Sequence, residues 1–188
     1  MIEFKNVNFA YKGSKENVLN DFSMHIKKGD RVWLSGPSGK GKTTVLRLIM
    51  GLEKPKNKTV RINESAKISV VFQEDRLIPF VSVKKNISLF SNDQKAQELL
   101  LKLGLEGCSD MTVDSLSGGM RRRVAIARAL SKDFDILILD EAMNGLDRET
   151  AEKTAQVIDD ICKDKTLIFV THHEEQAKLL CNRRIEIP

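Results

Sequence analysis

Hydrophobic and polar residues alternate along the first third of the chain, as they do in half-buried β-strands. The apolar positions of the first run are Ile2, Phe4, Val7, Phe9 and Tyr11. A second run covers 18–26, and a third, at 31–35, follows a tight turn predicted at 27–30. Short strands are also predicted at 59–62 and 68–72. We therefore expect an antiparallel sheet that leads into a central core.

The middle of the chain has helical spacing of its apolar residues and no convincing strand. Helices are predicted at 82–89, at 93–103 and from 117 to 130. The later elements are a strand at 135–140, a helix at 147–162, a strand at 166–170, a helix ending near Leu180 and a strand at 184–187. We predict one α/β domain of residues 1–188. Its β-subdomain and core are formed by 1–73 and 132–188, and an α-helical subdomain is inserted at 74–131.

A glycine-rich segment separates the third strand from a helical run at 45–50. Its residues are Gly36, Pro37, Ser38, Gly39, Lys40, Gly41, Lys42, Thr43 and Thr44. Strand, G-x-x-x-x-G-K-[ST] loop and helix in this order are typical of a phosphate-binding P-loop. The glycines let backbone N–H groups surround an anion, and the helix directs its positive N-terminal end at it. We expect Lys42 to reach the β/γ-phosphates and Thr43 to ligate Mg²⁺.

The alternative interpretation of this segment is a glycine-rich turn before an ordinary core helix. Because the flanking strand and helix are both present, the phosphate-binding interpretation is favoured. The core is therefore predicted to be a RecA-like P-loop NTPase core.

A second predicted helix N-terminus offers another anion site, formed by Ser117, Gly118 and Gly119. The arginines at 121–123 follow in the first turn of this helix, where their charge opposes the helix dipole. Such a charge run is typical of a solvated helix face, and we interpret it so.

Two carboxylates, Asp140 and Glu141, end the buried strand 135–139. Open α/β sheets bind their ligands at this edge, so Asp140 fits a residue that holds Mg²⁺. Glu141 fits a base that orients the attacking water. His172 ends the strand 166–170 and can reach a γ-phosphate, although a lone histidine is more often structural. Tyr11 can stack on adenine, or it is a plain strand aromatic.

Composition limits the functional classes. The net charge of +5 comes from 31 Lys and Arg against 26 Asp and Glu, which suits a nucleotide and does not indicate nucleic acid. The three cysteines are far apart, so neither a disulfide framework nor a zinc site is indicated. No signal-peptide pattern and no run of 18 apolar residues occurs. We expect a soluble chain whose membrane partners, if it has any, are separate subunits.

Taken in order, these motifs resemble the nucleotide-binding subunit of an ABC (ATP-binding cassette) transporter. The matching positions are Tyr11, the P-loop at 36–44, Gln73 as Q-loop glutamine, 116–120 as the signature, Asp140 and Glu141 as Walker B, Asp147 in the D-loop and His172 as H-switch. The resemblance covers essentially the whole chain. The signature is its most specific part, because other P-loop enzymes such as small-molecule kinases lack it.

The resemblance implies a Mg²⁺-dependent ATPase that works as a head-to-tail dimer. Each ATP would lie between the P-loop of one copy and residues 117–119 of the other, with Asp147 nearby. Thr43, Gln73 and Asp140 would surround Mg²⁺, with Gln73, Lys42, Glu141 and His172 acting in catalysis. The chain would be cytoplasmic and peripheral on the inner face of the membrane, driving solute transport through permease subunits.

Some positions depart from the family pattern. They are Met120, Ala142, Met143, Asn144, Gly145 and His173, and none removes a phosphate or metal ligand. The segments 73–80 and 116–121 look like the importer branch that handles nitrate, sulfonates and taurine. Leu77, Ile78, Pro79 and Phe80 would form the groove in which the membrane subunit docks, or they belong to the core of the helical subdomain. A soluble ABC ATPase with a mechanical or regulatory role is the alternative function.

Overall fold

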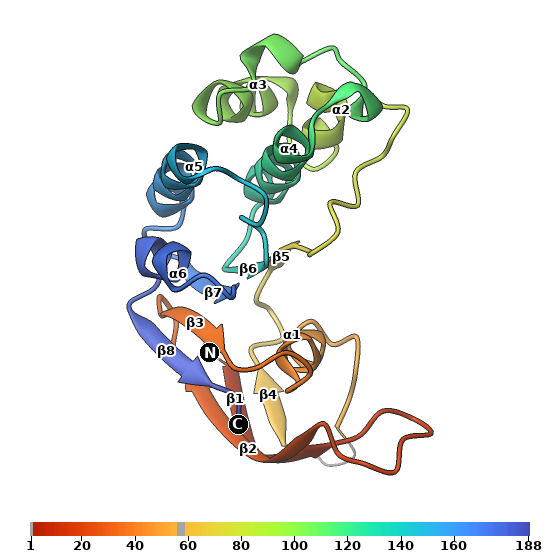
Figure 1. The fold of residues 1–188 in the computed structure, drawn as a ribbon, viewed down its shortest axis with the longest axis vertical. Helices are drawn as coiled ribbons and strands as arrows, with labels where there is room; N and C mark the ends of the chain where they lie inside the picture. The colour runs from red at the N-terminus through yellow and green to blue at the C-terminus, as the bar shows by residue number, and fades with distance from the viewer. Residues whose placement is uncertain (1, 56–58) are drawn as a thin grey trace.

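The computed structural model describes residues 2–55 and 59–188, and it contains two sheets (Figure 1). The smaller sheet is antiparallel with the order β2-β1-β4. Its strands are β1 (Ile2–Phe9), β2 (Leu19–Ile26) and β4 (Val60–Ile62). The antiparallel sheet expected from the alternating pattern at the start of the chain is confirmed. Tyr11 lies beyond the end of β1, and Val18 lies before the start of β2.

The larger sheet is parallel and has the order β5-β6-β7-β3-β8. Its strands are β3 (Arg31–Ser35), β5 (Ile68–Val71), β6 (Ile136–Asp140), β7 (Thr166–Val170) and β8 (Arg183–Glu186). Strands β6 and β7 are buried along their whole length. Their side chains alternate between the two faces of a sheet that is covered on both sides. Every position is therefore apolar except Asp140, at the end of β6, and Thr166, at the start of β7.

Helices cover both faces of this sheet and gather at one end of the molecule (Figure 1). The helices that accompany the sheet are α1 (Lys42–Ile49), α5 (Arg148–Ile161) and α6 (Glu174–Leu180). The helical end contains α2 (Val83–Ser88), α3 (Asp93–Lys102), α4 (Gly118–Ser131) and two single 3₁₀ turns, Glu106–Cys108 and Val113–Ser115. Ser82, Asn92, Ser117 and Asp147 cap the N-termini of α2, α3, α4 and α5 with their side chains.

Two hydrophobic cores meet at the parallel sheet. Leu137, Leu139 and Phe169 point into the core shared with α2–α5. Ile138 and Ile168 point into the other core, which α1 and the antiparallel sheet complete. The division between 74–131 and the rest of the chain stays a prediction, although all of α2, α3 and α4 lie between those residues. None of the helices in the described ranges is long and apolar enough to cross a bilayer.

Candidate nucleotide-binding site

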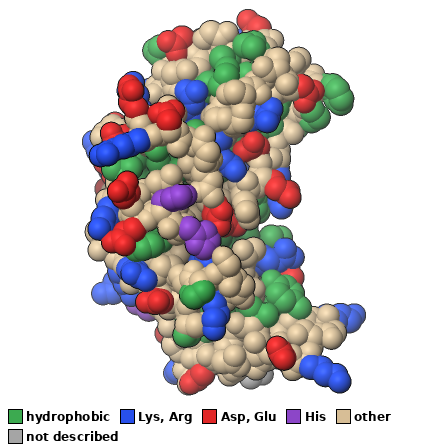
Figure 2. All heavy atoms as spheres, in the orientation of Figure 1, with side chains coloured by type: hydrophobic (Ala, Val, Ile, Leu, Met, Phe, Trp, Pro, Cys, Tyr) green, Lys and Arg blue, Asp and Glu red, His purple; other side chains and the backbone are tan. Residues whose placement is uncertain are grey.

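The carboxyl ends of the parallel strands open onto a cavity of about 420 Å³. It is lined by Tyr11, Val18, Ser38, Gly39, Gly41, Lys42, Thr43, Thr44, Gln73, Asp140, Glu141, Val170 and His172. The P-loop, both carboxylates, Gln73 and His172 therefore share one site, at the sheet edge where open α/β folds bind ligands. In the space-filling view, histidine and acidic side chains lie next to each other near the middle of the face shown (Figure 2).

The P-loop needs glycine at two positions for steric reasons. Gly36 has φ +144° and a Cβ there would lie 2.7 Å from the carbonyl oxygen of Ile187. Gly41 has φ +94° and a Cβ there would lie 2.9 Å from Cδ2 of Leu19. Side chains at these positions would push the loop away from the sheet, so the loop keeps its tight curve only with glycine.

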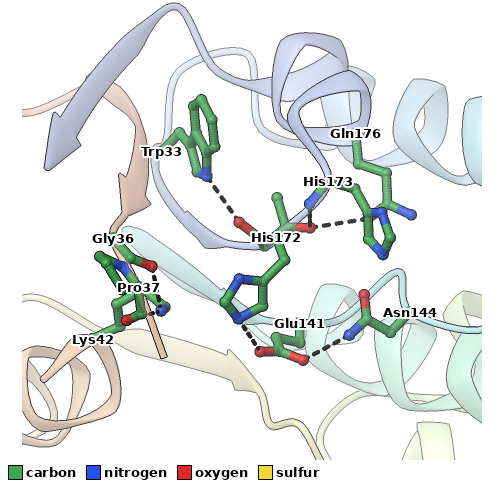
Figure 3. Close-up of polar contacts among 10 residues, drawn as sticks. Trp33, Gly36, Pro37, Lys42, Glu141, Asn144, His172, His173 and Gln176 are labelled. Atoms are coloured by element: carbon green, nitrogen blue, oxygen red, sulfur yellow. Dashed lines mark hydrogen bonds and ion pairs between the residues drawn. The ribbon is translucent and has the colours of Figure 1, made fainter. Parts of the chain in front are cut away.

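Lys42 is buried and directed back into the loop. Its Nζ donates hydrogen bonds to the carbonyl oxygens of Gly36, at 2.7 Å, and Pro37, at 2.9 Å (Figure 3). Helix α1 begins at Lys42, and no side chain caps its first turn. An ammonium group and uncapped helix amides thus point into the same cavity, which fits a phosphate group.

Asp140 and Glu141 lie opposite the P-loop at the end of β6. Burial, and secondarily the charge of Glu141, raises the pKa of Asp140 to about 6, although Lys42 and Arg122 counteract the shift. Glu141 has φ +49°, which is unusual for a residue with a side chain, and its N–H donates to the carbonyl of Val170 at 2.8 Å. A carboxylate that is hard to ionise beside a cationic loop fits a site completed by a divalent cation.

The Glu141 carboxylate is held from both sides (Figure 3). Its Oε1 lies 3.3 Å from Nε2 of His172, and its Oε2 accepts a hydrogen bond from Nδ2 of Asn144 at 2.6 Å. The side chain of Glu141 is only 17% exposed, whereas that of His172 is 44% exposed. The carboxylate is therefore fixed in orientation and can accept a proton from a water in the cavity.

The backbone that carries His172 is fixed by residues to which the sequence assigned no role. Trp33 Nε1 donates to the carbonyl of Thr171 at 3.1 Å, and the N–H of His173 donates to the Thr171 hydroxyl at 3.1 Å. Gln176 accepts from that hydroxyl and donates to the carbonyl of Met143. No signal in the sequence links Trp33 to Thr171 or Gln176 to Met143, because these contacts depend on which segments are neighbours in the fold. The contact between Asn144 and Glu141 is local, within a turn that the Asn144 N–H closes by donating to the Glu141 carbonyl.

Tyr11 lies at the cavity wall. Its hydroxyl is 3.0 Å from Oγ1 of Thr44, and its ring meets the Phe9 ring edge-on at 5.1 Å between centroids. Both interpretations of Tyr11 from the sequence remain compatible with this position, so its contact with adenine stays a prediction. The hydroxyl contact also joins Tyr11 to helix α1, a link that the sequence did not indicate.

The signature residues lie outside this cavity. Ser117 caps α4 by accepting from the Met120 N–H at 3.3 Å. A Cβ on Gly119 would lie 3.6 Å from Cδ2 of Leu146, in the turn before α5. Asp147 caps α5, and hydrogen bonds from the N–H and hydroxyl of Thr150 lower the pKa of its carboxyl. One copy of the chain therefore presents its two predicted anion-binding segments at separate places.

The interpretation of the arginines at 121–123 as a solvated face is wrong. Arg121 donates to the carbonyl of Leu116, and Arg123 donates to the carbonyls of Leu103 and Gly104. Arg122 donates to backbone carbonyls of the segment that carries Gln73. The aliphatic stems cover the helix, and the guanidinium groups take the place of water as donors to these carbonyls. The charged groups therefore keep hydrogen-bond partners although they are partly buried.

The fold and this cavity define a P-loop nucleotide-binding protein. The sequence profile of the ABC transporter family matches residues 19–144. The chain therefore belongs to the ABC transporter family, as its motifs predicted.

Similarity to known proteins extends over nearly the whole chain. The aliphatic sulfonates import ATP-binding protein SsuB 1 of Rhodococcus jostii (strain RHA1) is 37% identical over 94% of this chain and 76% of that protein. The taurine import ATP-binding protein TauB of Jannaschia sp. (strain CCS1) is 35% identical over 92% of this chain and 71% of that protein. A dimeric post-hydrolysis state of the ATP-binding cassette MJ0796 bound to ADP and Pi superposes with a TM-score of 0.88. It is 32% identical and covers 100% of this chain and 94% of that one.

Proposed function

We propose that this chain is the ATP-binding and ATP-hydrolysing subunit of an ABC importer for a small solute, which moves through separate membrane subunits. The observation that carries the proposal is the cavity that joins the P-loop to Asp140, Glu141 and His172. The import direction and solute class are supported by the relatives, which are named for sulfonate and taurine import.

In the proposed mechanism the P-loop amides and Lys42 bind the phosphates of ATP. Lys42 exchanges its bonds to the Gly36 and Pro37 carbonyls for bonds to phosphate oxygens. The oxygens of Thr43, Gln73 and Asp140, which line the cavity, would hold Mg²⁺, and the ion would supply charge neutralisation at the phosphates. Glu141 orients the water and accepts its proton, while His172 and Asn144 keep the carboxylate in place.

The site is completed by a second copy of the chain. Residues 117–119 offer a hydroxyl and the N-terminus of α4, a 14-residue helix, but they do not line the cavity of their own copy. A head-to-tail pair supplies these groups and Asp147 in trans, excludes water and aligns the attack. The dimeric MJ0796 cassette bound to ADP and Pi supports this arrangement.

We further propose that the chain lies on the cytoplasmic face of the membrane and docks there through residues 77–80. Phe80 is 88% exposed and Ile78 is 42% exposed, although an exposed phenylalanine is costly in water without a partner. Leu77 instead packs against the core of the helical end. The docking surface therefore consists of Ile78, Pro79 and Phe80, with Leu77 as its support.

A pull-down from membranes of the native host tests this function. The tagged chain is expected to recover a polytopic membrane protein, and the Phe80→Asp variant to lose it. Leu101→Asp is the matched control, because Leu101 is 63% exposed on α3 and is not among residues 77–80. Recovery of ribosomes or DNA would favour the soluble mechanical ATPase. Transport assays with vesicles would show efflux if the system exports.

A further inference from the structure

The loop that carries Gln73 is held by two arginines of α4. Arg122 donates to the carbonyl of Phe72 at 2.9 Å and to that of Gln73 at 2.6 Å. Arg128 donates to the carbonyl of Asp75 at 3.0 Å and to that of Arg76 at 2.7 Å. We call residues 72–76 the Gln73 loop. Four of its five carbonyls are bound by side chains that lie about fifty positions later in the chain.

The two arginine side chains are partly withdrawn from water, with the contacts to Phe72 and Asp75 part-buried and those to Gln73 and Arg76 at the exposed edge. The Arg122 side chain is 12% exposed, and it also lies 3.1 Å from Oδ1 of Asp75, which is 24% exposed. Burial lowers the pKa of Arg128, and the nearby Asp75 carboxylate partly restores it. Hydrogen bonds from a desolvated guanidinium are among the stronger ones in proteins. The planar group reaches two carbonyls at once, which the single ammonium of a lysine does not reproduce.

The Gln73 loop is also folded tightly on itself. Arg76 has φ +48° and its guanidinium lies 3.9 Å from the centroid of the Phe72 ring. A residue with a side chain persists in this backbone region only where its surroundings impose it. The hydrogen bonds from Arg122 and Arg128 hold the backbone on both sides of this turn, so removing them is expected to loosen the loop.

The position of α4 connects two parts of the site. The helix begins directly after Ser117, the residue that caps its N-terminus. One turn later, Arg122 reaches the carbonyl of Gln73, whose side chain lines the nucleotide cavity beside Asp140. A shift of the tip of α4 along the helix axis is therefore expected to move the Gln73 loop with it, because four hydrogen bonds join the helix to the loop.

We propose that Arg122, supported by Arg128, is a positioning residue for Gln73. Through it, a displacement of residues 117–119 at the start of α4 reaches the part of the cavity lined by Thr43, Gln73 and Asp140. This inference rests on the proposed function, in which Gln73 contributes an oxygen to Mg²⁺. Arg122 is not among the residues that line the nucleotide cavity. It acts by fixing the backbone from which Gln73 extends.

The test compares Arg122→Gln and Arg122→Lys with Arg61→Gln in the purified chain. Arg61 is 80% exposed on β4 and serves as the matched control. In Arg122→Gln we expect faster hydrogen exchange of amides 72–77 and an increase of about tenfold in the Mg²⁺ concentration for half-maximal hydrolysis. ATP affinity measured in EDTA should stay within about twofold, because the P-loop is untouched. Arg122→Lys should show the same direction of change, since it keeps the charge but loses the paired contacts.

Gln73→Ala separates failure of this inference from failure of the proposed function. If Gln73→Ala leaves the Mg²⁺ dependence unchanged, the metal role of Gln73 is wrong. If Gln73→Ala changes it and Arg122→Gln does not, or if exchange of 72–77 is unchanged, the positioning role is wrong. In the double variant the Arg122 effect on Mg²⁺ should largely vanish, and additive effects would also overturn the proposal. Should Arg122→Gln fail to fold, Arg122→Lys and Arg128→Lys provide the same readouts.

Discussion

Glu141 and His172 face each other across the ends of two neighbouring parallel strands, with Oε1 of Glu141 3.3 Å from Nε2 of His172. Asn144 binds the other carboxylate oxygen, so Glu141 has little freedom to rotate. A carboxylate fixed in this way beside the P-loop suits the proposed role of Glu141, which is to accept a proton from the attacking water.

Replacing Glu141 by Gln is expected to abolish turnover while ATP binding persists. The amide keeps the shape and can still be held by neighbours, but it cannot accept a proton, which lowers kcat by about 10² to 10⁴. Because hydrolysis no longer opens the pair, ATP should stabilise a dimer in size-exclusion chromatography. Glu98→Gln, on the exposed side of α3, is the control. A strictly monomeric Glu141→Gln protein in the presence of ATP would contradict the two-copy site.

Replacing His172 by Ala is expected to lower kcat by about tenfold or more with little change in ATP affinity, because it removes one of the two groups that orient Glu141. The comparison variant is His173→Ala. His173 contacts Thr171 only through its backbone N–H, which alanine retains. Equal losses in the two variants, measured as phosphate release, would show that the Glu141 contact is not what matters.

Replacing Lys42 by Ala is expected to weaken ATP binding by about two orders of magnitude, since a buried charge-assisted contact to phosphate is lost. Binding is measured directly by calorimetry, without hydrolysis. Lys153→Ala on α5, where the lysine is 73% exposed, is the control. Affinity near that of the wild type would exclude Lys42 from phosphate binding.

The loss of ATPase activity at acidic pH is expected to follow protonation of the Asp140 carboxyl. Its pKa is raised to about 6, so below that pH a proton competes with Mg²⁺ for the carboxylate. Activity at low Mg²⁺ should fall by up to about tenfold for each pH unit below 6, and excess Mg²⁺ should shift the limit to lower pH. A pH profile that does not respond to Mg²⁺ would assign the limit to another group.

The free energy of unfolding should fall as the pH rises from about 4 to 6, whereas the ATPase activity should rise over that range. The pKa of Asp140 is higher in the folded protein than its ordinary value of 3.8, so the folded state binds this proton more tightly. The destabilisation is absent below about pH 4, grows as the pH rises towards 6 and is complete above it. Asp140→Asn is therefore expected to raise Tm near neutral pH by about 2 to 4 °C per kcal/mol relieved, and to raise it less near pH 4. Thermal unfolding followed by circular dichroism, without Mg²⁺, measures both.

Local patterns were sufficient to predict the elements and the chemistry of this protein. Alternation predicted the antiparallel sheet, uniformly apolar runs predicted β6 and β7, and the helices predicted at 82–89 and 147–162 correspond to α2 and α5. Each of these features depends on residues a few positions apart, whose geometry the backbone period determines. The P-loop was predicted equally well, because its glycines and Lys42 all lie within the short segment 36–42.

Only the tertiary structure decided which distant groups meet. The strand order β5-β6-β7-β3-β8 brings His172 to Glu141 and Trp33 to Thr171. The spacing of apolar and polar residues along the chain does not specify this order. The arginines at 121–123 were interpreted as a solvated face because their partners are backbone carbonyls, which every sequence contains. Backbone acceptors carry no residue signature, so contacts to them become visible only when the chain is folded.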